Sequence, residues 1–230
     1  MNYICIIPAR SGSKRIKNKN ILKVKNKKLF DYTLESALKV KKIKKIIITT
    51  NIEKLIRKNS KKVIYIRRPK SLCRDNSTTE SAMQHSINYA DNLFHKQKTA
   101  VILLQPTSPL RNKDDIKKAI DVFEKGKYDS LFSAYKDKIF FWKYKDSKLI
   151  SVNYSYKNRM KTGYMKKKKK QNSFIVENGA IYIFKYKDFN KFNNRLFGKI
   201  GYSLMSKNNS LEIDYPEDIK TFKHYIYCKK

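Results

Sequence analysis

Glycine, proline and cysteine are all scarce in this sequence. Its 230 residues include 6 glycines and 5 prolines, which excludes collagen-like repeats and linker-like chains. The 3 cysteines are odd in number, widely spaced and without a CxxC pair, so neither a disulfide framework nor a zinc site is expected. No apolar run approaches the roughly 18 residues of a membrane span, and no basic segment precedes an apolar stretch at the start, as in a signal peptide. These absences predict a cytoplasmic protein with no membrane partner.

Acidic residues are also few. The chain has 19 aspartates and glutamates against 54 lysines and arginines, a formal net charge of +35. Such a charge favours polyanions, and a basic nucleic-acid-binding protein is therefore one candidate. The excess is mostly lysine spread along the whole chain, a pattern that biased codon usage also produces, so we expect nucleic-acid binding to be incidental.

Apolar residues make up 40% of the chain, enough for one large domain with a full hydrophobic core. Buried strands are predicted at 3–7, 46–48, 63–66, 100–104 and 180–184. Helical spacing of apolar residues occurs at 30–38, 83–94, 116–123 and 219–226, with Asn112 as a cap for the third of these helices. Repeated strand-helix units predict an α/β fold, with a mostly parallel sheet covered by helices on both faces and a ligand crevice at the carboxyl ends of the strands.

The alternation breaks between residues 136 and 172. This stretch contains a cluster of aromatics around Trp142 and a run of five lysines at 166–170. We interpret it as an insertion into a core formed by 1–135 and 173–230. A small hairpin cannot bury such aromatics alone, so the insertion is either an arm that packs on a second subunit or a local satellite core.

The first segment with chemical content follows the first predicted strand. It runs Pro8-Ala9-Arg10-Ser11-Gly12-Ser13-Lys14-Arg15 and continues to Lys19-Asn20. Small residues let backbone N–H groups approach an anion closely, and the basic residues supply charge for a polyphosphate. A single glycine excludes the GxxxxGK[ST] and GxGxxG patterns. The segment is interpreted as a phosphate cradle, with a solvated basic turn as the alternative.

A second polar loop follows the most apolar of the predicted strands. It reads Gln105-Pro106-Thr107-Ser108-Pro109-Leu110-Arg111. An amide and hydroxyls at the carboxyl end of a strand, stiffened by two prolines, indicate either a binding loop or an ordinary connector. Further along, Asn178-Gly179 is by itself a turn signal.

Near the carboxyl end, Glu212 and Asp214 stand two positions apart. In an extended segment this spacing puts both carboxylates on one face, where they can share a divalent cation. A Mg²⁺ site opposite a basic loop suits a nucleotide polyphosphate. The alternative is a helix start, because Pro216 followed by Glu217 and Asp218 is typical of a first helical turn and Asp214 could help to cap it.

Several of these segments occur in an order known from one family. They are Ile6–Lys14 with Lys19-Asn20, Arg68-Pro69, Leu103–Arg111, Asn178–Ile183 and Glu212–Asp218. Together they resemble the acylneuraminate cytidylyltransferases, also called CMP-sialic acid synthetases, over nearly the whole chain. Each motif is only moderately specific, and the argument rests on their occurring together in register.

The resemblance implies a Rossmann-like nucleotidyltransferase fold with a small dimerisation insertion. The implied enzyme is Mg²⁺-dependent and homodimeric, and joins CTP to a nine-carbon, sialic-type nonulosonic acid, giving a CMP-sugar and pyrophosphate. The implied catalytic residues are Arg10 and Lys19. The implied nucleotide-binding residues are Arg10, Ser13, Lys19, Asn20, Arg68, Ser77 and Thr79. The implied sugar-binding residues are Gln105, Thr107, Asn178 and Lys143, with Lys143 supplied by the neighbouring subunit. The implied metal ligands are Glu212 and Asp214.

Two positions depart from the family's pattern. Asn51 stands where relatives commonly carry an aspartate, so an acid that could assist the nucleotide or metal is neutral here. In the insertion, Asn158-Arg159 is followed by Met160-Lys161 where relatives tend to place an Arg-Gln pair. The motifs also leave the acceptor open between sialic acid and another 2-keto-3-deoxy sugar acid, such as legionaminic or pseudaminic acid.

Overall fold

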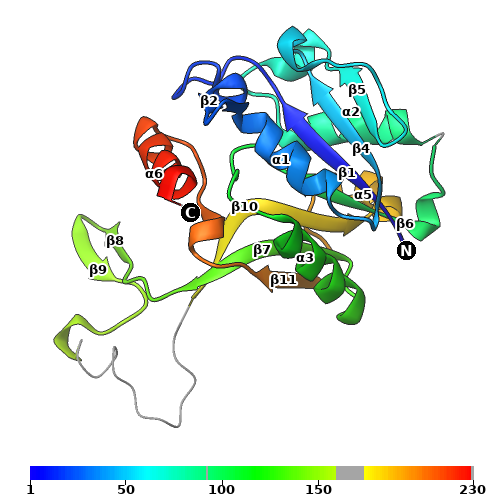
Figure 1. Ribbon diagram of the computed structural model, residues 1–230. Coiled ribbons are helices and arrows are strands. Elements are labelled where there is room, and N and C mark those ends of the chain that lie inside the picture. The colour runs from blue at the N-terminus through cyan, green and yellow to red at the C-terminus, as the bar shows by residue number, and fades with distance from the viewer. Residues whose placement is uncertain (92, 159–173, 229–230) are drawn as a thin grey trace.

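A seven-stranded sheet forms the centre of the protein, in the order β11-β7-β10-β6-β1-β4-β5. The computed structural model describes residues 1–91, 93–158 and 174–228 (Figure 1). The strands of this sheet are β1 (Asn2–Ala9), β4 (Ile43–Thr50), β5 (Val63–Arg67), β6 (Thr99–Leu104), β7 (Ser130–Asp137), β10 (Phe174–Lys185) and β11 (Ile200–Leu204). β10 is antiparallel to both of its neighbours, whereas all other neighbouring pairs are parallel. The prediction of a mostly parallel sheet is therefore confirmed.

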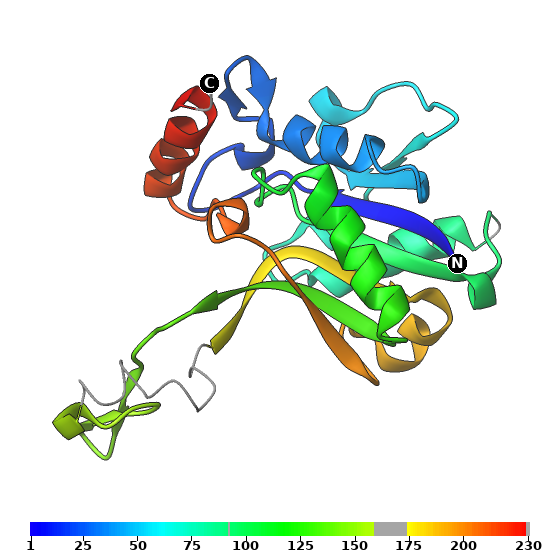
Figure 2. The ribbon, with the colours of Figure 1, turned by 60° about the horizontal axis from the view of Figure 1, so that its bottom comes forward.

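Helices cover both faces of this sheet, as predicted (Figures 1 and 2). The α-helices are α1 (Leu29–Leu38), α2 (Thr79–Ala90), α3 (Lys113–Lys125), α5 (Tyr186–Phe192) and α6 (Pro216–Cys228). One-turn 3-10 helices are η1 (Lys19–Ile21), η2 (Glu53–Leu55), η3 (Lys70–Cys73), η4 (Lys96–Lys98), η5 (Tyr156–Asn158) and η6 (Asn208–Ser210). Apolar residues of α1 and α3 belong to the hydrophobic cluster on one face, and those of α2 and α5 to the cluster on the other.

The central strand β1 shows why the apolar runs are continuous rather than alternating. Tyr3, Cys5 and Ile7 pack in the cluster with α1 and α3, and Ile4 and Ile6 in the cluster with α2 and α5. A parallel strand buried on both faces needs an apolar residue at every position. This is the pattern that identified the strand in the sequence.

The carboxyl end of β1 is where the sheet opens. β1 pairs with β4 as far as Ala9, but with β6 only as far as Ile6. Pro8, which has no N–H to donate, therefore lies where the edge of β1 that faces β6 is no longer paired. The basic segment after β1 starts at this rim, which is the position predicted for the ligand crevice.

The last helix, α6, joins the two ends of the chain. A third hydrophobic cluster includes Ile16 from the segment after β1, Leu29 from α1, and Ile213 and Phe222 from the carboxyl-terminal part. The rings of Tyr32 and Phe222 meet edge to face at 5.1 Å. This packing brings residues 212–214 beside the basic segment.

Two small hairpins complete the description. β2 (Lys23–Val24) and β3 (Lys27–Lys28) precede α1, and β8 (Trp142–Lys145) and β9 (Lys148–Ser151) follow β7. The β8–β9 hairpin stands away from the sheet beyond the ends of β7 and β10 in both views (Figures 1 and 2). The insertion predicted at 136–172 thus begins inside β7, and its part from residue 159 onward, with the lysine run, lies outside the described residues.

Among the helices of the described ranges, none is long and apolar enough to cross a membrane.

Candidate functional site

A pocket of about 360 Å³ opens at the rim where β1 and β6 separate. Its walls come from the segment after β1, from Arg68 and the residues that lead into α2, from the loop after β6, and from Asp214. The predicted site residues that it gathers are Arg10, Ser13, Lys19, Asn20, Arg68, Ser77, Thr79, Gln105, Thr107 and Asp214. Lys14 and Arg15, which the sequence predicts to supply charge for a polyphosphate, also line it, and so does Asp75.

The basic segment and Asp214 meet in this pocket. The Lys19 ammonium donates to the carbonyl oxygen of Ile213 at 2.8 Å and to the Asp214 carboxylate at 3.0 Å. Arg15 reaches the other oxygen of Asp214 at 3.2 Å, and its guanidinium lies over the ring of Tyr215. Residues from the two ends of the chain therefore form one charged cluster.

Local hydrogen bonds fix the shape of the basic segment. The Asn20 amide donates to the carbonyl oxygen of Arg10 at 2.9 Å. Asn51 accepts from the backbone N–H of Ser11 at 2.8 Å and donates to its hydroxyl at 2.7 Å. Gly12 has φ +76°, a left-handed conformation that glycine adopts without strain. The neutral residue at position 51 therefore holds the segment at its turn.

Arg68 forms a buried positive wall of the pocket. Its side chain is buried and donates to the carbonyl oxygen of Thr49 at 2.8 Å and to the Thr49 hydroxyl at 3.3 Å. Burial, together with the nearby charge of Arg10, lowers the pKa of Arg68 to about 10. A cation removed from water in this way interacts strongly with an anion that enters the pocket.

The segment between η3 and α2 lies against the basic segment. Arg10 donates to the carbonyl oxygen of Cys73 at 3.0 Å and lies 3.4 Å from the Asp75 carboxylate, which Lys14 contacts at 2.9 Å. Ser77 donates to the carbonyl oxygen of Ser71 at 3.1 Å. These contacts close one side of the pocket.

Glu212 lies deeper than Asp214. The Thr107 hydroxyl donates to Glu212 at 3.4 Å, and the backbone N–H of Ile213 donates to the carbonyl oxygen of Thr107 at 2.8 Å. Burial first, and the charge of Asp214 second, raise the pKa of Glu212. Two neighbouring carboxylates that repel each other suit a divalent cation, which removes the repulsion, and Mg²⁺ commonly binds one or two carboxylates together with substrate phosphates. The residues present therefore fit Mg²⁺.

The other reading of this acidic segment was a helix cap. Asp218 performs that role, because its carboxylate accepts from the backbone N–H groups of Asp214 at 2.8 Å and Tyr215 at 2.7 Å. The side chain of Asp214 points instead to Lys19 and Arg15. The Asp214 carboxylate is thus placed in the pocket.

A second pocket, of about 430 Å³, adjoins the first. Glu212 lines the second pocket and Thr107 lines the first. The two pockets therefore meet at the hydrogen bond between Thr107 and Glu212. Asn178 lines the second pocket, but its side chain is buried and accepts from Ser133 at 2.6 Å while it donates to Ser210 at 2.8 Å. Its amide is thus bound within the protein.

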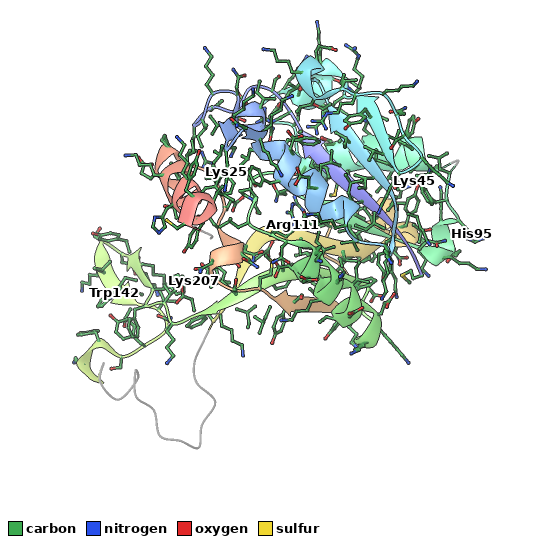
Figure 3. All side chains as sticks on the ribbon, in the orientation of Figure 1. Lys25, Lys45, His95, Arg111, Trp142 and Lys207 are labelled. Atoms are coloured by element: carbon green, nitrogen blue, oxygen red, sulfur yellow. The ribbon has the colours of Figure 1, made fainter. Side chains whose placement is uncertain are left out.

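Of the predicted site residues, Glu212 and Asn178 line the second pocket instead of the first, and Lys143 lines neither. It lies in β8, exposed, on the projecting hairpin whose Trp142 is labelled in Figure 3. Within this chain it is apart from the other site residues.

The residue that sequence reasoning missed is Arg111. It is 1% exposed and donates to the carbonyl oxygens of Gln105 at 3.1 Å and Ala180 at 2.8 Å, and to the Thr33 hydroxyl at 2.7 Å. It therefore ties the loop after β6 to β10 and α1. An arginine directly before the Asn112 cap was the available signal, but its burial is a tertiary property.

Residues 4–227 match the family model described as cytidylyltransferase. The chain belongs to this family. Among curated cytidylyltransferase relatives, N-acylneuraminate cytidylyltransferase of Escherichia coli is 31% identical over 92% of this chain, which spans 49% of that protein's length. Pseudaminic acid cytidylyltransferase of Campylobacter jejuni is 33% identical over 58% of this chain and 58% of its own length. Post-translational flagellin modification protein B of Campylobacter coli is 28% identical over 97% of this chain and 94% of its own length.

Solved structures support the same fold. The structure of CMP:2-keto-3-deoxy-manno-octonic acid synthetase complexed with CTP aligns with a TM-score of 0.69 over 100% of both chains, at 12% identity. The 4-diphosphocytidyl-2C-methyl-D-erythritol synthase of Anaerococcus prevotii aligns with a TM-score of 0.66 over 98% of both chains, at 15% identity. At these identities the likeness concerns the architecture alone.

Proposed function

We propose that this cytidylyltransferase joins CTP to a nonulosonic acid and yields a CMP-sugar and pyrophosphate. The observation that carries the proposal is the contact of Lys19 with Asp214, 3.0 Å apart. It joins a polyphosphate-binding segment to Asp214 of the carboxylate pair in one pocket, and a nucleoside triphosphate with its divalent cation requires cations and carboxylates together. The family match and the named relatives support the same reaction.

The nucleotide binds in the first pocket. Arg10, Ser13 and Lys19 hold the triphosphate, where charge-assisted hydrogen bonds from cations to phosphate oxygens are strongest. Asn20 contacts the nucleotide, and its amide also donates to the carbonyl oxygen of Arg10. The ribose and cytosine lie on the side of the pocket lined by Arg68, Ser77 and Thr79.

Glu212 and Asp214 are the residues that would hold Mg²⁺. When bound, the ion neutralises charge on the transferred and departing phosphates. Chelation by EDTA should therefore abolish turnover, and added MgCl₂ should restore it.

The reaction is an in-line displacement at the α-phosphorus. The sugar hydroxyl loses its proton and forms a new O–P bond, while the bond from the α-phosphorus to the bridging oxygen breaks and pyrophosphate leaves. Arg10 and Lys19 stabilise the charge that develops on the phosphate oxygens, which is where fixed cations contribute most to the rate.

The acceptor binds where the two pockets meet. Gln105 and Thr107 reach this place from the loop after β6, and Glu212 from the other side. Gly179, at φ +67°, leaves room here: a Cβ at this position would lie 3.4 Å from the Gln105 amide nitrogen and 3.5 Å from Glu212. Asn178 supports acceptor binding indirectly, because its hydrogen bonds to Ser133 and Ser210 stabilise the wall of the second pocket.

Residues 136–172 act as a dimerisation arm, inserted into a core of 1–135 and 173–230. The β8–β9 hairpin carries exposed apolar side chains, among them Phe141, Trp142 and Leu149, and clusters of exposed aromatics are typical of protein interfaces. In a homodimer the arm brings Lys143 to the acceptor carboxylate of the neighbouring subunit.

The decisive experiment measures pyrophosphate release from CTP with a panel of sialic, pseudaminic, legionaminic and 2-keto-3-deoxy-octonic acids. We expect release with CTP but not ATP, and only with a nine-carbon acid. Failure with every acid, by a folded protein that binds CTP, would contradict the proposal. The preferred acid identifies the acceptor, which percent identity does not decide: the relatives named for sialic and pseudaminic acids are 31% and 33% identical over the matched residues.

Mixing two inactive variants tests the arm. Arg10→Ala and Lys143→Ala should each be inactive as homodimers. In a mixed dimer the subunit with Arg10 receives Lys143 from its partner, so random exchange should restore about a quarter of the wild-type rate. No restoration despite subunit exchange would show that Lys143 does not act across the dimer.

A further inference from the structure

The cations of the phosphate-binding segment are not free in this pocket. Each of those that line it pairs with a carboxylate, and the pairs are Arg10 and Lys14 with Asp75, and Arg15 and Lys19 with Asp214. A polyphosphate bound by these cations must therefore compete with two carboxylates. Asp214 has a second role in the carboxylate pair with Glu212, but nothing above assigns a role to Asp75.

The contacts of Asp75 are of a kind that can exchange. Its side chain is 53% exposed, and its carboxylate meets the tips of two flexible side chains, Lys14 at 2.9 Å and Arg10 at 3.4 Å. Exposed ion pairs of this type contribute little to stability, because water and salt screen them. A phosphate with several charged oxygens can replace such a carboxylate.

The backbone beside Asp75 lets the carboxylate leave without loss of structure. The Arg10 guanidinium also donates to the carbonyl oxygen of Cys73 at 3.0 Å, and the backbone N–H of Ser77 donates to the carbonyl oxygen of Arg74 at 3.0 Å. These bonds keep the segment against the pocket when the Asp75 side chain turns outward.

We propose that Asp75 is an exchangeable counter-ion for the polyphosphate: it competes with CTP and pyrophosphate for Arg10 and Lys14. The inference rests on the proposed function, because it takes this pocket as the polyphosphate site. Competition weakens every ligand that needs these two cations by the same factor and leaves others unchanged. It also aids release of pyrophosphate, since the returning carboxylate takes over the cations that the product leaves.

Asp75→Asn removes the charge and keeps the shape. Titration calorimetry of the full-length protein should show about three- to tenfold tighter binding of both inorganic pyrophosphate and CTP. Cytidine, which has no phosphate, should bind with unchanged affinity in a ligand-observed NMR titration. In turnover, the inhibition constant of pyrophosphate should fall by the same factor as its dissociation constant.

Asp121→Asn is the matched control. Asp121 is 54% exposed and accepts from Lys42 at 3.0 Å, so it resembles Asp75 in exposure and pairing but lies on α3, outside both pockets. It changes the net charge equally and should leave the affinity for pyrophosphate unchanged. Asp75→Glu, which keeps the charge, should bind pyrophosphate as the wild type does.

Equal or weaker binding of CTP by Asp75→Asn overturns the inference, because it means that Asp75 contacts the nucleotide rather than competing with it. Equal tightening by Asp121→Asn overturns it too, since net charge then explains the effect. A wild-type protein that binds neither CTP nor pyrophosphate contradicts the proposed function itself, and the two failures are thus distinguishable.

Discussion

At the scale of single residues, Arg111 shows how a charge can serve structure from inside the protein. Figure 3 labels it in the interior, and burial lowers its pKa to about 10. Its Nε has no hydrogen-bond partner among the described residues. The three hydrogen bonds of its other nitrogens offset the cost of burying the side chain. Those bonds hold the loop that carries Gln105 and Thr107.

Arg111→Met should destabilise the protein, because it leaves the carbonyl oxygen of Ala180 and the Thr33 hydroxyl without their donor and removes one of two donors to the carbonyl oxygen of Gln105. Each unsatisfied buried group costs about 1–3 kcal/mol, partly offset by removal of a buried charge. We expect a loss of about 2–4 kcal/mol in urea unfolding. Lys117→Met, at an exposed cation of α3, is the control; equal losses would refute the structural role.

Lys19→Met should reduce kcat/KM by about 100-fold or more, measured as initial rates of pyrophosphate release, because it removes a fixed cation from the developing charge. Lys17→Met is the control, since Lys17 is exposed two positions away and does not line the pocket. A loss of less than fivefold in the Lys19 variant would remove Lys19 from the catalytic group.

Site residues could be predicted from the sequence where a local motif marks them. Motif-derived residues such as Arg10 and Gln105 lie together in one pocket, because each follows a recognisable strand at the rim. The structural role of Arg111 was missed, since it depends on partners from other elements. The roles of Arg10, Lys143 and the metal pair stay predictions.

At the scale of elements, α6 positions the acidic segment through its first turn. Pro216 begins the helix, and Asp218 reaches back to the N–H groups of Asp214 and Tyr215. The cap and the proposed metal ligands Glu212 and Asp214 therefore share one short stretch of backbone.

Asp218→Ala should cost about 1 kcal/mol of unfolding free energy, as the loss of a helix cap does, and should raise the Mg²⁺ concentration needed for half-maximal activity, because residues 212–214 lose their anchor. Thermal unfolding and a Mg²⁺ titration measure the two effects. Glu217→Ala, at the exposed neighbour, should change neither. A loss of stability with an unchanged Mg²⁺ requirement would separate the cap from the site.

Asp129 connects three strands of the sheet. It accepts from Lys185 at 2.6 Å and from the backbone N–H of Lys199 at 2.8 Å, and these bonds, that of Lys185 first, lower its pKa. Because the pKa of Asp129 is lowered in the folded state, its ionised carboxylate stabilises the protein at pH values above the ordinary aspartate pKa near 4. This stabilisation is lost as the pH falls through the folded-state pKa. Asp129→Asn should therefore be less stable than wild type at pH 7, and the difference in urea midpoint should close at strongly acid pH.

Helices α1, α2, α3 and α6 were predicted from their apolar spacing, and the strands were predicted where they are buried on both faces. Runs such as 100–104 are apolar at every position, which predicts a strand buried on both faces. β7 and β11 include serines and glycine, and their strand pairing is long-range, so the local pattern did not reveal them. The reversed direction of β10 follows from its neighbours, which no local pattern contains. The helix predicted to 94 ends at Ala90, and Phe94 packs on the same cluster from the connection beyond.

At the scale of the whole molecule, the charge of +35 is spread far beyond the pocket. If it serves no specific polyanion, duplex DNA should bind measurably at 20 mM salt and negligibly at about 150 mM, because counter-ion release dominates such binding. Filter binding at the two salt concentrations tests this, with CTP turnover followed in parallel. Tight binding of DNA at the higher salt would favour a nucleic-acid function instead.

The contact between Lys19 and the backbone of Ile213 spans 194 positions of the chain. On the ribosome, the sheet from β1 to β6 can assemble while translation continues, yet the cluster that joins both ends exists only after residue 214 has emerged. The pocket is therefore complete only after the chain has been synthesised through residue 214, later than the first strands of the sheet.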